Sequence, residues 1–269
     1  MQRTDRLILF PYRSGSSGGS ELIPEGELKR KYPKTWNYFN ENKETLEGRE
    51  DGKMRHSGWH GYVYPKALDV MALPKIFTPD LSPRAAFSLD SSGENFFTGG
   101  VAGGYGILVR PEYSPEFVLG LLNSSVLDWF HHHGATQMRG GWYSYESRFI
   151  RNLPIAAANP IQQSAVATVA SALLLLLASD ESGGRRASAV SFYDQLLNGL
   201  VYELFFQKEL HAAGVYPFRL VEQFHLPDAA DAEALIAWAK NGDATSHPIR
   251  GALFTLGSLE TIRIIEGRE

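Results

Sequence analysis

The chain has 269 residues, 43% of them hydrophobic and 21% charged, which is the balance of a folded globular protein rather than a disordered one. The absence of cysteine excludes disulfide bonds and thiolate metal sites, and the formal net charge of −4 excludes a uniformly basic nucleic-acid-binding chain. The longest aliphatic run, 172–178, is far shorter than the roughly 20 residues of a membrane span. We therefore expect a cytoplasmic protein that does not contact a membrane.

Charge is distributed unevenly along the chain. Residues 1–155 carry 18 of the 26 Lys and Arg residues and 17 of the 30 Asp and Glu residues, so this part is nearly neutral and the remainder is acidic. Basic clusters occur locally in the first part, at 29–34 and 53–56. A balanced domain with such clusters can bind DNA, especially when another domain supplies most of the phosphate contacts.

The first fifty residues predict a strand, a loop and a helical region. Residues 6–12 (RLILFPY) form an apolar run rich in strand formers that Pro11 ends, so we expect this run to enter a sheet. The segment 14–20 (SGSSGGS) predicts a loop, which is either an ordinary surface loop or one that faces DNA. Residues 24–49 predict helix with a break at Pro33.

A turn-rich stretch at 52–65 combines cations with aromatic rings. One interpretation is a loop that folds its rings onto the core while the cations stay in water, and the other is a loop that contacts DNA phosphates. We keep both interpretations open. The candidate phosphate contacts in this stretch are Lys53, Arg55 and His56.

Short strands are predicted next, at 73–78 and 85–90, followed by a glycine-rich segment at 96–109 that breaks up two more. The glycine cluster does not have the context of a cofactor-binding loop, because such a loop needs a following helix whose N–H groups face the phosphate. Residues 107–109 (ILV) continue as a strand instead. A glycine-rich hairpin is therefore the prediction.

The stretch 114–155 holds the leading functional candidate. Ser114 and Pro115 suit the start of a helix, and the helix has an apolar stripe formed by Phe117, Leu121, Leu122, Val126 and Trp129. A loop, 137–145 (QMRGGWYSY), follows and predicts contact with a polar, ring-bearing polymer, because it mixes a cation, hydrogen-bond donors and planar rings on a backbone freed by two glycines. A strand ending at Pro154 is expected after the loop.

His131, His132 and His133 lie at the end of the predicted helix and suggest a metal site. Adjacent helical residues point in different directions, and no carboxylate stands at ligand spacing nearby. Favourable placement at a helix C-terminus, or contact with phosphate, is the better interpretation.

Beyond Pro154 the chain predicts helices. Asn159 and Pro160 open a helix that runs to about Ser179, a break is predicted at 182–184, and a second long helix covers about 187–213. The two helices are expected to pack as an antiparallel pair. A short helix follows at 231–240, and 253–265 remains open between strand and helix.

No catalytic site can be assigned from the sequence. A nuclease of the Pro-Asp…Glu-x-Lys type needs a later Glu-x-Lys, but both such triplets, at 27–29 and 41–43, precede Pro79-Asp80. An amino-methyltransferase needs an Asn/Asp-Pro-Pro-Tyr loop for the flipped base, and 159–162 (NPIQ) keeps only its first two residues. The chain is therefore predicted to be non-catalytic by itself.

The order of these features resembles the TaqI-like C-terminal specificity domain, the target recognition part of adenine-specific DNA methyltransferases and of fused restriction-modification (type IIG) enzymes. The resemblance covers roughly residues 5–156, and the later helical part is similar to the tail found in the same enzymes. The residues that carry it are RLILFPY at 6–12, the 32–49 helix, the segment at Trp59, PKI at 74–76, LLNS at 121–124 and NLPI at 152–155, with FY at 192–193 and LVYEL at 200–204 in the tail.

The resemblance implies an α+β fold in which a sheet-containing DNA target recognition domain, 1–156, precedes a helical C-terminal segment, 157–269. It implies double-stranded DNA and the parent enzyme's methyltransferase domain as partners. S-adenosylmethionine is expected in that parent domain and no cofactor in this chain. The rival functions are a protein-interaction module using the helical segment and a stand-alone nuclease.

Local chemistry, rather than the resemblance, selects the contact residues. An arginine can address guanine through two hydrogen bonds, and aromatic rings can stack or wedge at a base step. The first-choice DNA contacts are Arg139, Trp142, Tyr143 and Tyr145. The second choice, mainly for phosphate, is Lys53, Arg55, His56 and Lys75.

Overall fold

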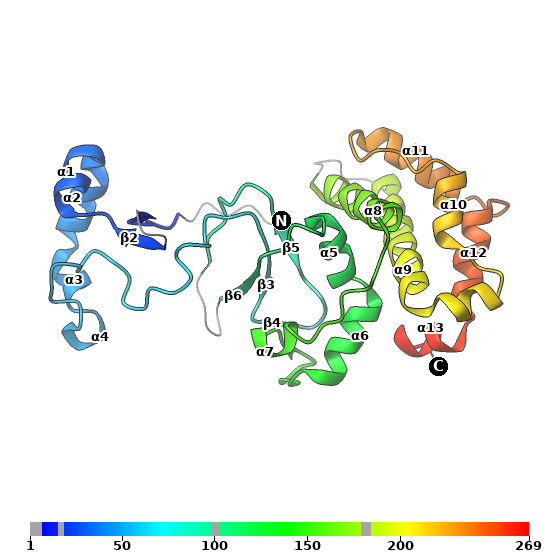
Figure 1. The fold of residues 1–269 in the computed structure, drawn as a ribbon, viewed down its shortest axis with the longest axis horizontal. Helices are drawn as coiled ribbons and strands as arrows, with labels where there is room; N and C mark the ends of the chain where they lie inside the picture. The colour runs from blue at the N-terminus through cyan, green and yellow to red at the C-terminus, as the bar shows by residue number, and fades with distance from the viewer. Residues whose placement is uncertain (1–6, 16–18, 98–102, 179–183, 269) are drawn as a thin grey trace. The chain divides into compact units, whose positions relative to one another are not determined.

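The computed structural model describes residues 7–15, 19–97, 103–178 and 184–268, and it divides into two compact units. The N-terminal unit consists of Gln2–Leu73 with Ser92–Phe96, and the C-terminal unit of Pro74–Ser91 with Phe97–Glu269. Short antiparallel sheets and many helices confirm the predicted α+β class (Figure 1). The predicted division into segments 1–156 and 157–269 was inferred from the family resemblance, whereas the two units are defined by compactness. The predicted division therefore stays a prediction.

In the N-terminal unit, a two-stranded antiparallel hairpin precedes a series of short helices. Its small core contains Ile23, Leu28, Phe39 and Trp59. The predicted helical region with a break at Pro33 is confirmed, because Pro33 opens a new helix at its first position. The elements are β1 (Tyr12–Ser14), β2 (Ser20–Leu22), α1 (Glu25–Lys31), α2 (Pro33–Glu41), α3 (Lys43–Glu47) and α4 (Arg49–Gly52).

The apolar run 6–12 does not form the predicted strand over its length. Strand β1 begins only at Tyr12, and the preceding Leu7, Ile8 and Leu9 are exposed to solvent. Arg6, and residues 16–18 of the predicted glycine-serine loop, lie outside the described residues. The run is therefore apolar without being covered by its own unit.

Three strands form the antiparallel sheet of the C-terminal unit, in the order β5-β3-β6. They are β3 (Lys75–Pro79), β5 (Ser88–Asp90) and β6 (Gly104–Ile107), and a separate pair joins β4 (Leu81–Ser82) to β7 (Tyr143–Ser144). In the glycine-rich segment, the described strand pairs with β3, where Pro79 lies opposite Gly104, whereas Gly99 and Gly100 lie outside the described residues.

The central helix predicted from Ser114 onward is two helices, α5 (Pro115–Leu122) and α6 (Ser125–Gly134). Asn123 separates them because its side chain binds the backbone of Phe87, accepting from the Phe87 N–H and donating to the Phe87 carbonyl, each at 3.0 Å. Ser114 caps α5, as predicted, and Ser124 caps α6. The two hydrogen bonds of Asn123 connect the end of α5 to the segment before β5.

The prediction of a strand that ends at Pro154 is wrong for the residues after Ser144, where β7 ends. The backbone instead forms a helical turn, α7 (Ser147–Ile150), which begins where the Phe149 N–H bonds to the Glu146 carbonyl at 2.9 Å. The turn brings both Phe149 and Ile150 toward the interior, where Ile150 packs on the core and the Phe149 ring meets His131 edge-on. A strand would have sent these consecutive side chains to opposite faces.

Two long helices dominate the rest of the C-terminal unit and confirm the predicted pair. Helix α8 (Pro160–Ala178) packs against both α5 and α9 (Gly184–Ala212), and Figure 1 shows the pair side by side. The predicted break at Ser182 and Gly183 lies outside the described residues. By length and composition alone, α8 is apolar enough to cross a membrane, but in this structure it packs against α5 and α9.

The last quarter of the chain is helical. The predicted helix at 231–240 is α11 (Ala232–Gly242), and the stretch left open at 253–265 contains the end of α12 (Pro248–Leu256) and all of α13 (Glu260–Ile265). A further helix, α10 (Pro217–Gln223), was not predicted. All of these helices contribute residues to the core that α8 and α9 share.

A buried ion pair joins the neighbouring strands β3 and β5. The Lys75 ammonium lies 2.6 Å from the Asp90 carboxylate, and both residues are almost completely buried at a paired position of β3 and β5. Lys75 is therefore a structural residue, and we correct its assignment as a phosphate contact. The sequence alone did not show that the Lys75 side chain is buried beside Asp90.

We expect Lys75→Met to lower the free energy of unfolding by about 3–5 kcal/mol, because the buried Asp90 carboxylate loses its counter-charge. Lys75→Met combined with Asp90→Leu should recover most of the loss. Urea denaturation followed by circular dichroism measures both, with Lys208→Met at an exposed position of α9 as the control. Unchanged stability in Lys75→Met would contradict a structural role.

Candidate nucleic-acid interface

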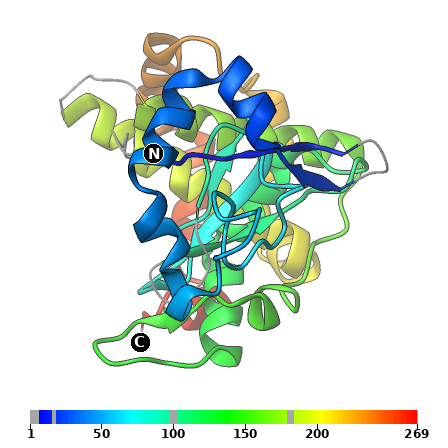
Figure 2. The ribbon, with the colours of Figure 1, turned by 90° about the vertical axis from the view of Figure 1, so that its left-hand side faces the viewer.

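The predicted contact loop forms a β-hairpin that leaves the end of α6. The Ser144 N–H bonds to the Thr136 carbonyl at 3.0 Å, and the Met138 N–H bonds to the Trp142 carbonyl at 2.7 Å. Between them, Gly140 and Gly141 both have φ of +77°, a backbone region that side-chain-bearing residues rarely adopt. The two glycines therefore make the tight turn that defines the hairpin tip, which Figure 2 shows as a green loop extending beyond α6.

The tip presents a cation and a large ring to solvent. Arg139 is exposed and, within the part of the chain that the structure describes, its guanidinium makes no hydrogen bond or ion pair. Trp142 keeps 44% of its surface accessible and Met138 keeps 41%. A free guanidinium beside an open indole ring can meet both the polar edge and the flat face of a base.

The other two aromatic candidates face inward. Tyr143 and Tyr145 are two residues apart in an extended segment, so their side chains share the face opposite Trp142. The Tyr143 ring stacks on His132 with centroids 3.8 Å apart, and the Tyr145 ring stacks on His131 at 4.0 Å. The hairpin is thus attached to α6 by two ring stacks.

Tyr145 is fully buried, and its hydroxyl donates to the Asp128 carboxylate at 3.2 Å. Burial and the neighbouring Asp128 raise the pKa of the Tyr145 hydroxyl, so the ring stays neutral. We therefore correct the assignment of Tyr145 as a DNA contact: it supports the hairpin. Tyr143 is half-buried, with one ring face against His132, and remains a candidate.

Two of the three consecutive histidines, His131 and His132, form the platform beneath the hairpin. The buried His131 ring makes a hydrogen bond through Nε2 to the Ser144 carbonyl at 3.0 Å, and His132 lies 3.3 Å from the Asp128 carboxylate. The exposed His133 bonds instead to the Trp129 carbonyl in its own helix. Sequence reasoning missed this platform, although adjacent histidines followed by Tyr-x-Tyr were a signal for it.

Three of the four second-choice contacts lie in the N-terminal unit. Lys53, Arg55 and His56 are all exposed, whereas the neighbouring Trp59 and His60 are buried, so the stretch combines solvated polar side chains with rings packed in the core. The Lys53 ammonium lies 4.5 Å from the centre of the Tyr64 ring. All three side chains are accessible to a phosphate from solvent, and their role as DNA contacts stays a prediction.

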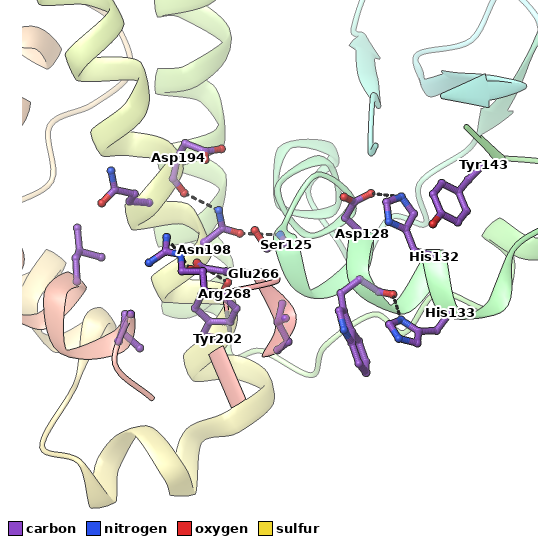
Figure 3. Close-up of a pocket in the computed structure, with 16 residues that line it drawn as sticks. Ser125, Asp128, His132, His133, Tyr143, Asp194, Asn198, Tyr202, Glu266 and Arg268 are labelled. Carbon is purple, nitrogen blue, oxygen red and sulfur yellow. Dashed lines mark hydrogen bonds and ion pairs between the residues drawn. The ribbon is translucent and has the colours of Figure 1, made fainter. Parts of the chain in front are cut away.

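A pocket of about 580 Å³ lies at the foot of the hairpin (Figure 3). Asp128, His132 and Tyr143 form one side, and Asp194 and Asn198 on α9 form another. Among the described residues, no group of three or more His, Asp or Glu is arranged to hold a metal ion.

Comparison with known proteins shows a partial similarity to a methyltransferase. Over 62 residues the chain is 37% identical to the type II methyltransferase M.BanIII of Aneurinibacillus aneurinilyticus. The matched stretch is 23% of this chain and 11% of that protein, so the chain corresponds to a small part of the relative's length. No family model matches the chain. The similarity indicates a relationship to a methyltransferase.

The histidine platform predicts a pH dependence. Burial lowers the pKa of His131, assisted by neighbouring His132 and opposed by the Ser144 carbonyl and Asp128. The folded protein therefore takes up this proton less readily than the unfolded chain. The stability that neutral His131 contributes is complete above its ordinary pKa of about 6.5 and is lost as the pH falls below that value.

We expect the free energy of unfolding to decrease between pH 7.5 and pH 5, and His131→Gln to reduce that decrease because glutamine does not titrate. Urea denaturation across this range is the measurement. His56→Gln, at an exposed position of the N-terminal unit, serves as the matched control. A pH dependence that is identical in the wild type and His131→Gln would show that His131 does not couple protonation to folding.

Proposed function

We propose that this chain is the DNA-specificity part of an adenine-specific DNA methyltransferase or of a fused, type IIG restriction-modification enzyme, and that it is non-catalytic by itself. The observation that carries the proposal is the hairpin tip, where Arg139 and Trp142 are exposed while the base of the hairpin is fixed to α6. A rigid support with free recognition groups lowers the ordering cost of binding. The similarity to a type II methyltransferase supports the same context.

In the proposed complex, the hairpin tip enters a groove of double-stranded DNA. Arg139 donates two hydrogen bonds to a guanine edge, and the Trp142 ring stacks against a base or wedges at a base step. Tyr143 stands behind the tip with one ring face on His132. Lys53, Arg55 and His56 contact phosphates, which fixes position without reading sequence.

Catalysis belongs to the parent enzyme in this proposal. Its methyltransferase domain binds S-adenosylmethionine and acts on the adenine, and this chain selects where that domain works. The division fits a net charge of −4, because a separate domain would supply most of the phosphate contacts. The adenine-modifying domain and double-stranded DNA are accordingly the proposed partners.

The proposal predicts different effects on DNA binding for the substitution of two basic side chains, Arg139 and Lys53. Arg139→Ala should relax base preference at one position of the bound site, where a correct bidentate contact discriminates by about 1–3 kcal/mol. Lys53→Ala should weaken binding on all sequences alike and lower the magnitude of the salt slope by about 1. Sequencing the DNA bound from a randomised duplex pool, at two salt concentrations, measures both effects.

The matched control is Arg185→Ala, which removes an exposed cation from α9. An equal loss on every sequence for both Arg139→Ala and Lys53→Ala would contradict the division of roles. Absence of salt-sensitive binding at low salt would contradict DNA recognition itself and favour a protein-interaction module. Magnesium-dependent cleavage of the pool by the wild type would favour the nuclease alternative.

A further inference from the structure

The register of the hairpin is set by its backbone contacts. Gln137 and Tyr143 form an antiparallel bridge, and the Met138 N–H bonds to the Trp142 carbonyl at 2.7 Å. Met138 therefore lies directly opposite Trp142, and residues 139–141 make the turn between them. This pairing decides which side chains share a face of the hairpin.

The two faces of the hairpin differ in what they contact. Side chains of directly opposed residues share a face, and the next residue along each strand points to the other face. Gln137 and Tyr143 therefore share one face, from which the Tyr143 ring stacks on His132 with centroids 3.8 Å apart (Figure 3). Met138 and Trp142 share the opposite face, which agrees with their exposed fractions of 41% and 44%.

Met138 and Trp142 form a narrow apolar edge at the free end of the hairpin. Directly opposed residues have β-carbons about 4.5–5.5 Å apart, so the thioether and the indole ring are neighbours. Gly140 and Gly141 have no side chains with which to cover this pair. A β-carbon added at Gly140 would lie 3.6 Å from Cδ1 of Trp142, so the indole ring lies beside the turn, at the tip of the hairpin.

The cation in the turn indicates which partner fits this edge. Arg139 belongs to the same turn, and its guanidinium makes no hydrogen bond or ion pair within the part of the chain that the structure describes. A DNA duplex offers base edges that accept hydrogen bonds from a guanidinium, and apolar base faces that become accessible when a base step opens. Two side chains are too few for a protein interface, which buries about 800 Å² per partner. A base step is therefore the partner that this edge fits.

The attachment of the hairpin suits the opening of a base step. An apolar side chain can hold a step open only if its own support does not yield, because the stacking of the bases opposes it. Besides the stack of Tyr143 on His132, the fully buried Tyr145 ring stacks on His131 with centroids 4.0 Å apart. The edge is thus presented on a fixed base, which lowers the ordering cost of binding.

We propose that Met138 and Trp142 together enter a base step of the bound duplex as an apolar wedge, unstack it and kink the DNA away from the hairpin. This inference rests on the proposed DNA recognition and adds to it Met138 as a specificity-determining residue and a distortion of the DNA. Pyrimidine–purine steps unstack most easily, so the wedge selects such a step next to the base that Arg139 addresses. Apolar wedges kink a duplex by roughly 20–90°.

Two fluorescence measurements test the wedge on the duplex that the wild type selects from a randomised pool. Energy transfer between dyes at the two ends of the duplex reports the kink, and 2-aminopurine in place of each purine in turn reports unstacking. Wild-type binding should bring the dyes closer and raise the 2-aminopurine fluorescence at one step. The double variant Met138→Gln, Trp142→Gln should abolish both signals. Phe254→Gln, at an 81% exposed ring on α12, should leave them unchanged.

The single variant Met138→Gln tests the part of this residue in specificity. The wild type should prefer the selected pyrimidine–purine step about tenfold over a purine–purine step at the same place, and Met138→Gln should reduce that preference to about threefold or less. Competition binding with the two duplexes measures the preference. The position is exposed, so folding tolerates the polar side chain. An undiminished preference in Met138→Gln would remove this residue from the wedge.

The outcomes separate the wedge from DNA recognition itself. A wild type that selects a duplex but neither kinks it nor unstacks a step overturns the wedge and leaves the proposed function standing. A kink that persists in the double variant also overturns the wedge, because another part of the chain would then bend the DNA. A wild type that binds no duplex overturns the proposed function and the wedge with it.

Discussion

The stacking of the Tyr143-x-Tyr145 strand on two consecutive histidines is the interaction on which the candidate interface depends. His131 and His132 each hold one tyrosine ring, and the Asp128 carboxylate accepts the Tyr145 hydroxyl. Because strand side chains alternate, placing both tyrosines inward places Trp142 outward. The base of the hairpin is thereby fixed while its glycine tip remains the part that can meet a ligand.

This arrangement separates support from recognition within one short segment. The buried ring of Tyr145 and the neutral His131 stabilise the hairpin, and neither needs to touch DNA for the tip to be positioned. The exposed side chains of Arg139 and Trp142 can be replaced without disturbing the support, since they share only the backbone with the buried rings. Such a division suits a specificity element, in which a constant framework carries changeable base-reading side chains.

The sequence predicted the long helices well, because apolar spacing and capping residues are local signals: Ser114 and Pro115 mark the start of α5, and Pro160 starts α8. It failed where tertiary contacts override local preference. Asn123 breaks the central helix to bind the distant Phe87 backbone, and Lys75 turns inward to meet Asp90. In the hairpin, composition selected Trp142 and Tyr145 alike as DNA contacts. The structure shows that the extended backbone turns their side chains to opposite faces, so that Trp142 is exposed and Tyr145 is buried.

Photo-crosslinking from the hairpin tip tests the central claim most directly. A p-benzoylphenylalanine at position 142 should crosslink to bases within the duplex that the wild type selects, whereas the same group at Phe254, exposed on α12, should give no base crosslinks. Mapping the crosslinked nucleotides by primer extension would locate the contact. Duplex binding that proceeds with no crosslink from position 142, or with crosslinks only from position 254, would contradict the hairpin as the DNA-reading edge.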